Sequence, residues 1–139
     1  MNLPVTIDAS VFVSAFTPTE PAHSASKAIM MVIREQSIPI IVPVLVLPEI
    51  SAALSRGQGK PELGKAFVQE LKGFPNTTFV DVDETVADLA VEIAANNRLR
   101  GSDAVYAAVA LRFGTELITL DKEQLERLPK VLSVRKPGE

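Results

Sequence analysis

The sequence predicts an α/β protein, a three-layer α/β/α sandwich around a central, mostly parallel sheet. Two observations favour this class: five short apolar segments have strand character, and stretches with helical periodicity lie between them. Strands that alternate with helices imply parallel strands joined by right-handed crossovers, with helices on both faces of the sheet. Because no internal repeat or long linker divides the chain, we expect a single domain over residues 1–139.

The expected strands are short, and several are rich in the β-branched residues that favour extended backbone. In chain order they are Leu3–Ile7, Pro39–Val42, Thr77–Val82, Glu116–Leu120 and Val131–Val134. Between them, apolar residues recur with the three-and-four spacing of one helix face, which predicts helices that each cover one side of the sheet. The periodic positions are Ala25, Ala28, Ile29, Val32 and Ile33, then Leu63, Ala66, Phe67 and Leu71, and later Val86, Leu89, Ala90 and Ile93.

The composition is that of an ordinary globular protein. Hydrophobic residues make up 47% and charged residues 22% of the 139 positions, which argues against extended disorder. The absence of cysteine excludes disulfides, thiol nucleophiles and cysteine-based zinc sites, and it favours a cytoplasmic location. The longest apolar run, Ile38 to Pro48, is interrupted by prolines and is too short to span a bilayer. We therefore expect no membrane segment.

Two of the expected strands end in an aspartate. Asp8 follows the first strand, and Asp121 follows the fourth, with the hydroxyl of Thr119 two residues before it. In open α/β sheets, ligands bind outside the carboxyl ends of the strands, so both carboxylates are candidates for a site there. The alternative is that they only cap helices: Asp8 or Ser10 the helix that follows, and Asp121 the short helix Lys122–Leu128.

Two further acids interrupt apolar segments. Asp103 lies in the first turn of an alanine-rich helix that runs from Ser102 to Ala110, where the helix dipole alone would favour an anion. Glu49 interrupts the apolar stretch 44–50, and an ionised carboxylate is rarely buried in such a stretch without a partner. Either Glu49 faces a polar cleft or its helix has one solvated edge. Pro48 favours a position near the start of that helix.

Carboxylates gathered at one edge of a sheet repel each other. Two of them about 4 Å apart repel by roughly 4 kcal/mol at an effective dielectric of 20, which raises one pKa and keeps that group protonated. A divalent cation removes this penalty, and oxygen ligands suit Mg²⁺ or Mn²⁺, which can activate water against a phosphodiester. The formal charge of −3 weakens the case for tight, non-specific binding of nucleic acid, but it is compatible with a metal-dependent nuclease.

The acids fall in four ordered motifs that cover nearly the whole chain. They are a strand with Asp-x-Ser, a helix start that begins with proline and ends in glutamate, an Asp-Ala pair that leads an alanine-rich helix, and Thr-x-Asp: Ile7–Ser10, Pro43–Glu49, Ser102–Ala110 and Thr119–Asp121. Together these motifs resemble the PIN-domain family, and the overall pattern is similar to its VapC-type toxin branch.

The resemblance implies four acidic residues that bind Mg²⁺ or Mn²⁺ and catalyse hydrolysis by metal-activated water: Asp8, Glu49, Asp103 and Asp121. It also implies a second group that surrounds these acids or contacts the substrate: Ser10, Thr119 and Arg100. For Arg100 a solvated surface position is at least as good an alternative. One departure is Ala52, one helical turn after Glu49, where many relatives carry asparagine, so that polar support for Glu49 is missing from this position.

The same resemblance implies an endoribonuclease that acts as the toxin of a type II toxin–antitoxin system. Its partners would be an RNA substrate, a cognate antitoxin that inserts a segment into the active-site cleft, and a second copy in a homodimer. Two alternatives keep the fold: a catalytically silent PIN-fold binding module, and an RNA-processing nuclease outside a toxin–antitoxin pair. A phosphoryl-accepting domain, such as a haloacid-dehalogenase-type phosphatase, fits less well. That phosphatase would need a second aspartate two residues after the first, where this chain has Ser10.

Overall fold

The computed structural model describes residues 3–139, which form a five-stranded sheet with helices packed around it. The strands are β1 (Val5–Ile7), β2 (Ile40–Pro43), β3 (Thr77–Val80), β4 (Glu116–Ile118) and β5 (Val134–Arg135). The helices are α1 (Ala9–Phe16), α2 (His23–Glu35), α3 (Val46–Gln58), α4 (Pro61–Lys72), α5 (Glu84–Asn97), α6 (Gly101–Phe113) and α7 (Lys122–Arg127).

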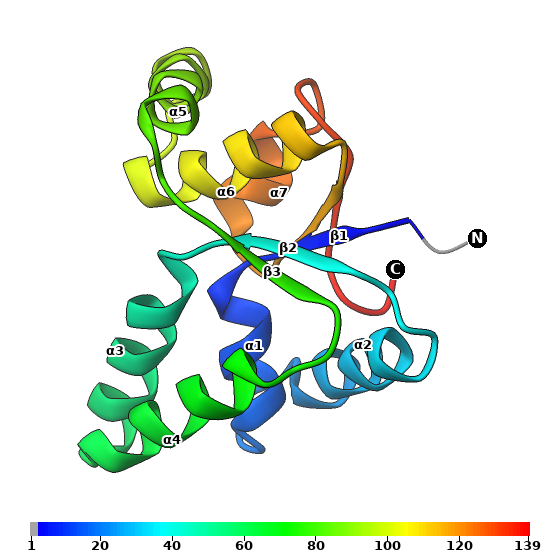
Figure 1. Cartoon of the computed structure of the whole chain (residues 1–139), viewed down its shortest axis with the longest axis vertical. Coiled ribbons are helices and arrows are strands. Elements are labelled where there is room, and N and C mark those ends of the chain that lie inside the picture. Colours follow the sequence, from blue (N-terminus) through cyan, green and yellow to red (C-terminus); the bar gives the residue numbers. More distant parts are fainter. Residues whose placement is uncertain (1–2) are drawn as a thin grey trace.

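All five strands run parallel, in the order β3-β2-β1-β4-β5. The central strand β1 pairs with β2 on one side and with β4 on the other, where Ile7 lies opposite Ile118. Figure 1 shows α1 to α4 on one side of the sheet and α5 to α7 on the other. This arrangement confirms the predicted three-layer α/β/α sandwich.

The first four expected strands overlap β1 to β4, but the fifth is wrong for most of its length. Instead of Val131–Val134, the strand begins at Val134. The N–H groups of Val131 and Leu132 donate to the carbonyl oxygen of Leu128 at 2.8 and 3.1 Å, so these two residues form a turn after α7. They are apolar because they pack against the core, which is why sequence pattern alone mistakes them for a strand.

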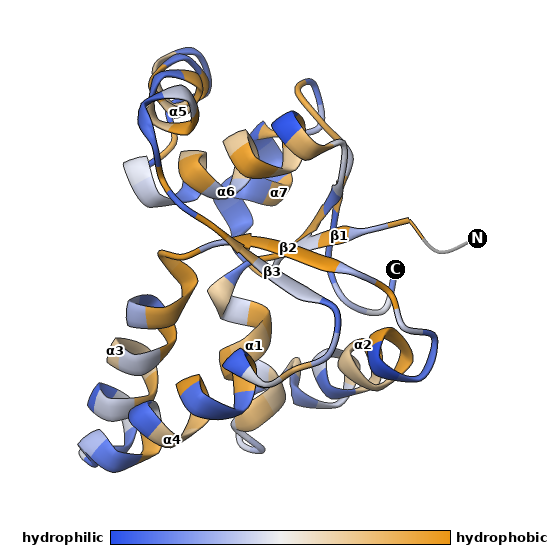
Figure 2. Cartoon of the chain, viewed as in Figure 1, coloured by the Kyte–Doolittle hydropathy of each residue, from blue (hydrophilic) through white to orange (hydrophobic). Residues whose placement is uncertain are grey.

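The core lies on both faces of the sheet. All of β1 is buried, and β2 is almost wholly hydrophobic in Figure 2, whereas α2, α4 and α5 alternate hydrophobic and hydrophilic residues. Helix α6 is largely buried, and four of its alanines are completely inaccessible to solvent: Ala104, Ala107, Ala108 and Ala110. Their short side chains let α6 lie close to β1, β2 and β4. Within residues 3–139, no helix is both long and apolar enough to cross a membrane.

The strand order creates a topological switch point between β1 and β4. From β1 the chain adds β2 and β3 on one side of the sheet, and it later adds β4 and β5 on the other. Loops that leave the carboxyl ends of β1 and β4 therefore run in opposite directions and leave a crevice between them, which is where open α/β sheets bind ligands. Asp8 and Asp121 lie at this crevice, because each follows one of the two strands.

Helix α3 begins beside the same crevice and packs against α4. Pro48 lies in its first turn, as expected, where a missing N–H breaks no helical hydrogen bond. The two helices approach closely at Gly64: a Cβ atom there would lie 2.6 Å from the carbonyl oxygen of Ser51 and 3.0 Å from its Cα. Ser51 follows Glu49 by only two residues, so this close contact lies next to Glu49 along α3.

We predict opposite effects for two glycine-to-alanine substitutions in this helix pair. Gly64→Ala should lower the free energy of unfolding by about 1–3 kcal/mol, because the added methyl forces the two backbones apart. Gly57→Ala is the matched control, since nothing lies within 4 Å of its Cβ position. It should raise that free energy by up to about 1 kcal/mol, the helix preference of alanine over glycine. Urea unfolding of both variants tests the pair; equal effects would contradict the close packing of α3 on α4.

Candidate active site

The four predicted acids lie on four different elements and line one cleft of about 400 Å³. Asp8 and Asp121 immediately precede α1 and α7, whereas Glu49 and Asp103 lie in the first turns of α3 and α6. All four positions are at helix starts on the carboxyl side of the sheet. The structure therefore brings together residues that are up to 113 positions apart in the sequence, from Asp8 to Asp121.

The two aspartates that follow strands also cap helices. Oδ2 of Asp8 accepts a hydrogen bond from the Ser10 N–H at 2.9 Å, and Oδ1 of Asp121 accepts one from the Gln124 N–H at 2.9 Å. The two alternative interpretations of these acids, cap or cluster member, are thus compatible, because a carboxylate has a second oxygen to direct into the cleft.

Burial and mutual repulsion disfavour the charged forms of two acids. Asp8 and Asp103 are only 7% and 6% exposed. Desolvation by burial raises the pKa of Asp8, and the nearby charges of Glu49 and Asp121 raise it further. Desolvation also raises the pKa of Asp103, with a further contribution from Asp121 that Arg100 partly offsets. The cleft therefore favours protons or cations.

Arg100 places a positive charge across two of these acids. Its Nε donates to Oδ2 of Asp103 at 3.0 Å, and its Nη2 donates to Oδ2 of Asp121 at 3.1 Å. Its own side chain is 70% exposed. Arg100 lines the cleft, and its expected contact with substrate phosphate stays a prediction. The side chain is solvated, as the alternative had it, but its guanidinium also binds two of the acids.

The two predicted hydroxyl groups both bind the loop that follows β4. Ser10 Oγ, at the start of α1, accepts a hydrogen bond from the Leu120 N–H at 3.1 Å. Thr119 is fully buried, and its Oγ1 accepts from the Asp121 N–H at 3.0 Å and donates to Gln124 Oε1 at 2.5 Å. Ser10 lines the cleft, whereas Thr119 lies beneath it and supports Asp121.

Gln124 is a site residue that the sequence analysis missed. Its buried side chain links two of the motifs, since Nε2 donates to the Asp103 carbonyl oxygen at 3.2 Å while Oε1 accepts from Thr119. A sequence signal was available: Gln124 follows the helix cap Asp121 by three residues, the spacing of a capping box. Here the glutamine side chain turns inward to α6.

Tyr106 is the second missed residue. Its hydroxyl donates to Glu49 Oε1 at 2.6 Å, and the side chain is completely buried. Desolvation, together with the charges of Asp8 and Glu49, raises the pKa of the Tyr106 phenol far above its ordinary value, so the group stays a protonated donor. Position 106 is one helical turn after Asp103, on the same face of α6, which is the signal that would have indicated it.

The chemistry of this donor set fits a partly hydrated divalent ion. Among the Asp, Glu and His side chains of residues 3–139, no group of three converges closely enough to enclose a metal by itself. Mg²⁺ does not require such a cage, because it usually binds one or two carboxylates and keeps several waters. Such an ion would relieve the repulsion between Asp8 and Asp103, whose pKa values are raised, and the other acids that line the cleft.

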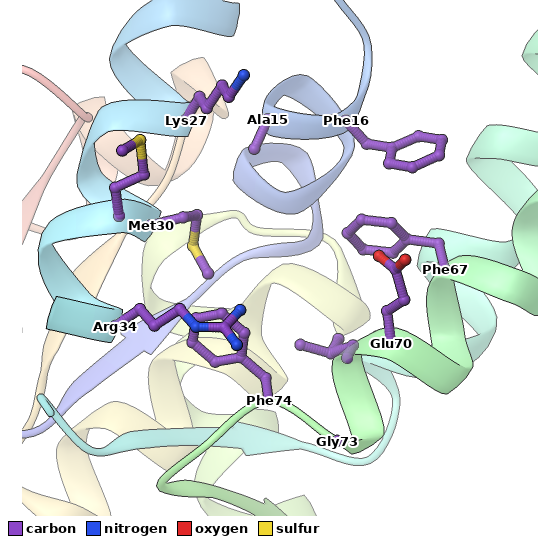
Figure 3. Close-up of a pocket in the computed structure, with 11 residues that line it drawn as sticks. Ala15, Phe16, Lys27, Met30, Arg34, Phe67, Glu70, Gly73 and Phe74 are labelled. Atoms are coloured by element: carbon purple, nitrogen blue, oxygen red, sulfur yellow. The ribbon is translucent and has the colours of Figure 1, made fainter.

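A larger, apolar groove of about 590 Å³ lies between α1, α2 and α4 (Figure 3). Phe16 packs edge-on against Phe67 with ring centroids 4.7 Å apart, and the Arg34 guanidinium lies 5.5 Å from the centre of the Phe74 ring. The acidic cleft begins at the first turn of α1 and this groove begins at its last turn, with Ala15 and Phe16. The acidic cleft extends along α1 to Val13, so the two cavities adjoin the same short helix.

Comparison with known proteins matches residues 5–131 to the family model of the PIN domain. A search of curated protein sequences gave no match. The fold is similar to that of several solved structures at low sequence identity, which supports the fold alone.

Three of these structures are VapBC or VapC proteins. DNA-bound VapBC from Salmonella typhimurium is 16% identical, with a TM-score of 0.72 and 98% of each chain covered. VapBC2 from Rickettsia felis, bound to a fragment of promoter DNA, is 14% identical, with a TM-score of 0.72 and 96% and 98% covered. VapC20 from Mycobacterium tuberculosis, a toxin that cleaves the sarcin–ricin loop, is 17% identical, with a TM-score of 0.68 and 85% and 90% covered.

We predict that Asp8→Asn stabilises the metal-free protein at neutral pH, by roughly 0.5–2 kcal/mol. Burial raises the folded-state pKa of Asp8, so the folded protein binds a proton there more tightly than the unfolded chain does. The resulting contribution to stability is complete below the ordinary pKa of 3.8, and it is lost as the pH rises through the folded-state pKa and the buried carboxyl ionises. Asparagine cannot ionise and can still cap α1. Urea unfolding in chelator should therefore show a gap between variant and wild type at pH 7 that closes towards pH 3.8.

Asp88→Asn is the matched control, since it removes the same charge from an exposed position on α5. It should leave the pH dependence of stability close to that of the wild type. A variant at position 8 that is less stable than the wild type at pH 7, or a gap that does not change with pH, would contradict the electrostatic description of the cleft.

Proposed function

The chain belongs to the PIN domain family, and we propose on this basis that it is a divalent-metal-dependent endoribonuclease, the toxin of a type II toxin–antitoxin pair. The observation that supports the proposal is the meeting of the four predicted acids, with Glu20 as a fifth, in one cleft at the topological switch point. Buried acids with raised pKa values are typical of functional sites rather than of stabilising ion pairs.

In this proposal Asp8 and Asp103 would hold Mg²⁺ or Mn²⁺, with Glu49 and Asp121 as the further acids of the site. The bound ion would polarise a phosphoryl oxygen and lower the pKa of its water. Glu49, which lines the cleft, would accept the proton of the attacking water. The water oxygen forms a bond to phosphorus, the phosphorus–oxygen bond of the leaving nucleotide breaks, and that oxygen takes up a proton from solvent.

Arg100 has a specific part in this scheme. Its side chain is 70% exposed, and its guanidinium is held to the cleft by Asp103 and Asp121. An ion that neutralises these two carboxylates would weaken both contacts and leave the guanidinium for a phosphate oxygen, which it can bind through two parallel N–H groups. Arg100 would thus contact the RNA backbone next to the cleaved bond.

The antitoxin partner is supported by the VapBC complexes among the similar structures. We assign the groove of Figure 3 to this partner, as the surface for an apolar segment with acidic residues beside it. The groove walls carry two cations, Lys27 and Arg34, against one anion, Glu70, so its charge complements an acidic segment. A segment along α1 would also reach the catalytic cleft, because α1 is only about 12 Å long at 1.5 Å per residue.

The experiment that tests the activity is cleavage of structured and single-stranded RNA by antitoxin-free protein, with Mg²⁺, Mn²⁺ or a chelator. We expect cleavage only with metal. Asp103→Asn should reduce the rate by about 100-fold or more, since even outer partners of a metal ligand typically contribute 10–100-fold. Asp88→Asn, a change of the same kind at an exposed position on α5, should cleave like the wild type.

Equal cleavage by wild type and Asp103→Asn would indicate a contaminating nuclease. No cleavage by the wild type across all RNAs would overturn the enzymatic proposal and favour a catalytically silent binding module. Metal-dependent cleavage by a protein whose gene has no antitoxin gene beside it would instead favour an RNA-processing nuclease.

A further inference from the structure

The hydrogen bond between Tyr106 and Glu49 joins two layers of the molecule at the cleft. Glu49 lies on α3 and Tyr106 on α6, which pack on opposite sides of the sheet in Figure 1. The 2.6 Å distance is short for a bond between two oxygens, as expected when a hydroxyl donates to an ionised carboxylate. The phenol binds only Oε1 of the carboxylate.

Helix α3 itself offers no polar support to Glu49. The residues that follow it by three and four positions, and so share its face of the helix, are Ala52 and Ala53. Neither side chain can form a hydrogen bond. A glutamate has three side-chain torsions, and one at the edge of a cleft would sample several of them without a fixed partner.

We propose that Tyr106 is the positioning residue for Glu49, holding one carboxylate oxygen so that the other faces the cleft. The catalytic effect of this positioning rests on the proposed metal-dependent nuclease, whereas the contact between Tyr106 and Glu49 does not. Tyr106 would act through Glu49 rather than on the RNA, because its hydroxyl is buried behind the carboxylate and its ring is enclosed in the core. Removal of the Tyr106 hydroxyl should therefore cause part of the decrease in metal affinity that removal of the Glu49 carboxylate causes.

The composition of the chain provides a direct spectroscopic test. Tyr106 is the only tyrosine, and tryptophan is absent, so the intrinsic emission of the protein comes from this residue. A phenol that donates to a carboxylate is quenched, because the excited hydroxyl transfers its proton to the acceptor. We expect Glu49→Gln to raise the emission above that of the wild type, with no metal or RNA present.

Metal binding tests the positioning role. Mn²⁺ titrations by calorimetry should give a dissociation constant about tenfold weaker for Tyr106→Phe, within the 10–100-fold range for outer partners of metal ligands. If Tyr106 acts through Glu49, the double variant Tyr106→Phe/Glu49→Gln should bind Mn²⁺ no more weakly than Glu49→Gln alone. A purely structural role for the tyrosine would make the two losses additive.

Thr115→Val is the control for loss of a buried hydroxyl. Thr115 is bonded to Thr6 in the core, away from the acids, so the variant should retain both the emission and the Mn²⁺ affinity of the wild type. Unchanged emission in Glu49→Gln would overturn the contact, and additive losses, or equal losses in Thr115→Val, would overturn the positioning role. A wild type that binds Mn²⁺ with these couplings but cleaves no RNA would leave the positioning of Glu49 intact while refuting the nuclease.

Discussion

Repulsion between carboxylates at the switch point of a parallel sheet is the constraint on which the rest of this structure depends. Parallel strands bring their carboxyl ends to one edge, and here each of four chain segments delivers an acid to that edge. Burial makes the repulsion stronger, because low dielectric screens charge poorly. A fold that accepts this cost must hold the acids rigidly and provide for a counter-charge.

Rigidity comes from hydrogen bonds that connect the motifs to one another. Ser10 ties the start of α1 to the loop after β4, and Gln124 ties α7 to the first turn of α6. Tyr106 adds the link from α6 to α3. None of these bonds is made within a single motif, so the geometry of each acid depends on the placement of another segment. Counter-charge comes from Arg100 in the absence of an ion.

Much of the fold follows from local pattern, whereas the full set of four acids was expected from the resemblance of the ordered motifs to the PIN-domain family. Alternating strand and helix segments predict the parallel sheet, and strands that end in Asp8 and Asp121 predict where these carboxylates meet. The contact between Glu49 and Tyr106 could not be predicted, because it joins residues 57 positions apart whose approach depends on how α3 and α6 pack on the sheet. The position of β5 was missed for a related reason: residues in a turn are apolar when they cover the core.

The double use of Asp8 and Asp121 as helix caps and cleft residues has a consequence for how this fold diverges. Serine, threonine and asparagine cap helices about as well as aspartate, so each of them preserves α1 or α7 while it removes a charge from the cleft. A single nucleotide change can convert an aspartate codon to one for asparagine. A single substitution can therefore give a folded protein with an incomplete acidic site. Evolution towards a non-catalytic scaffold would not require an unstable intermediate.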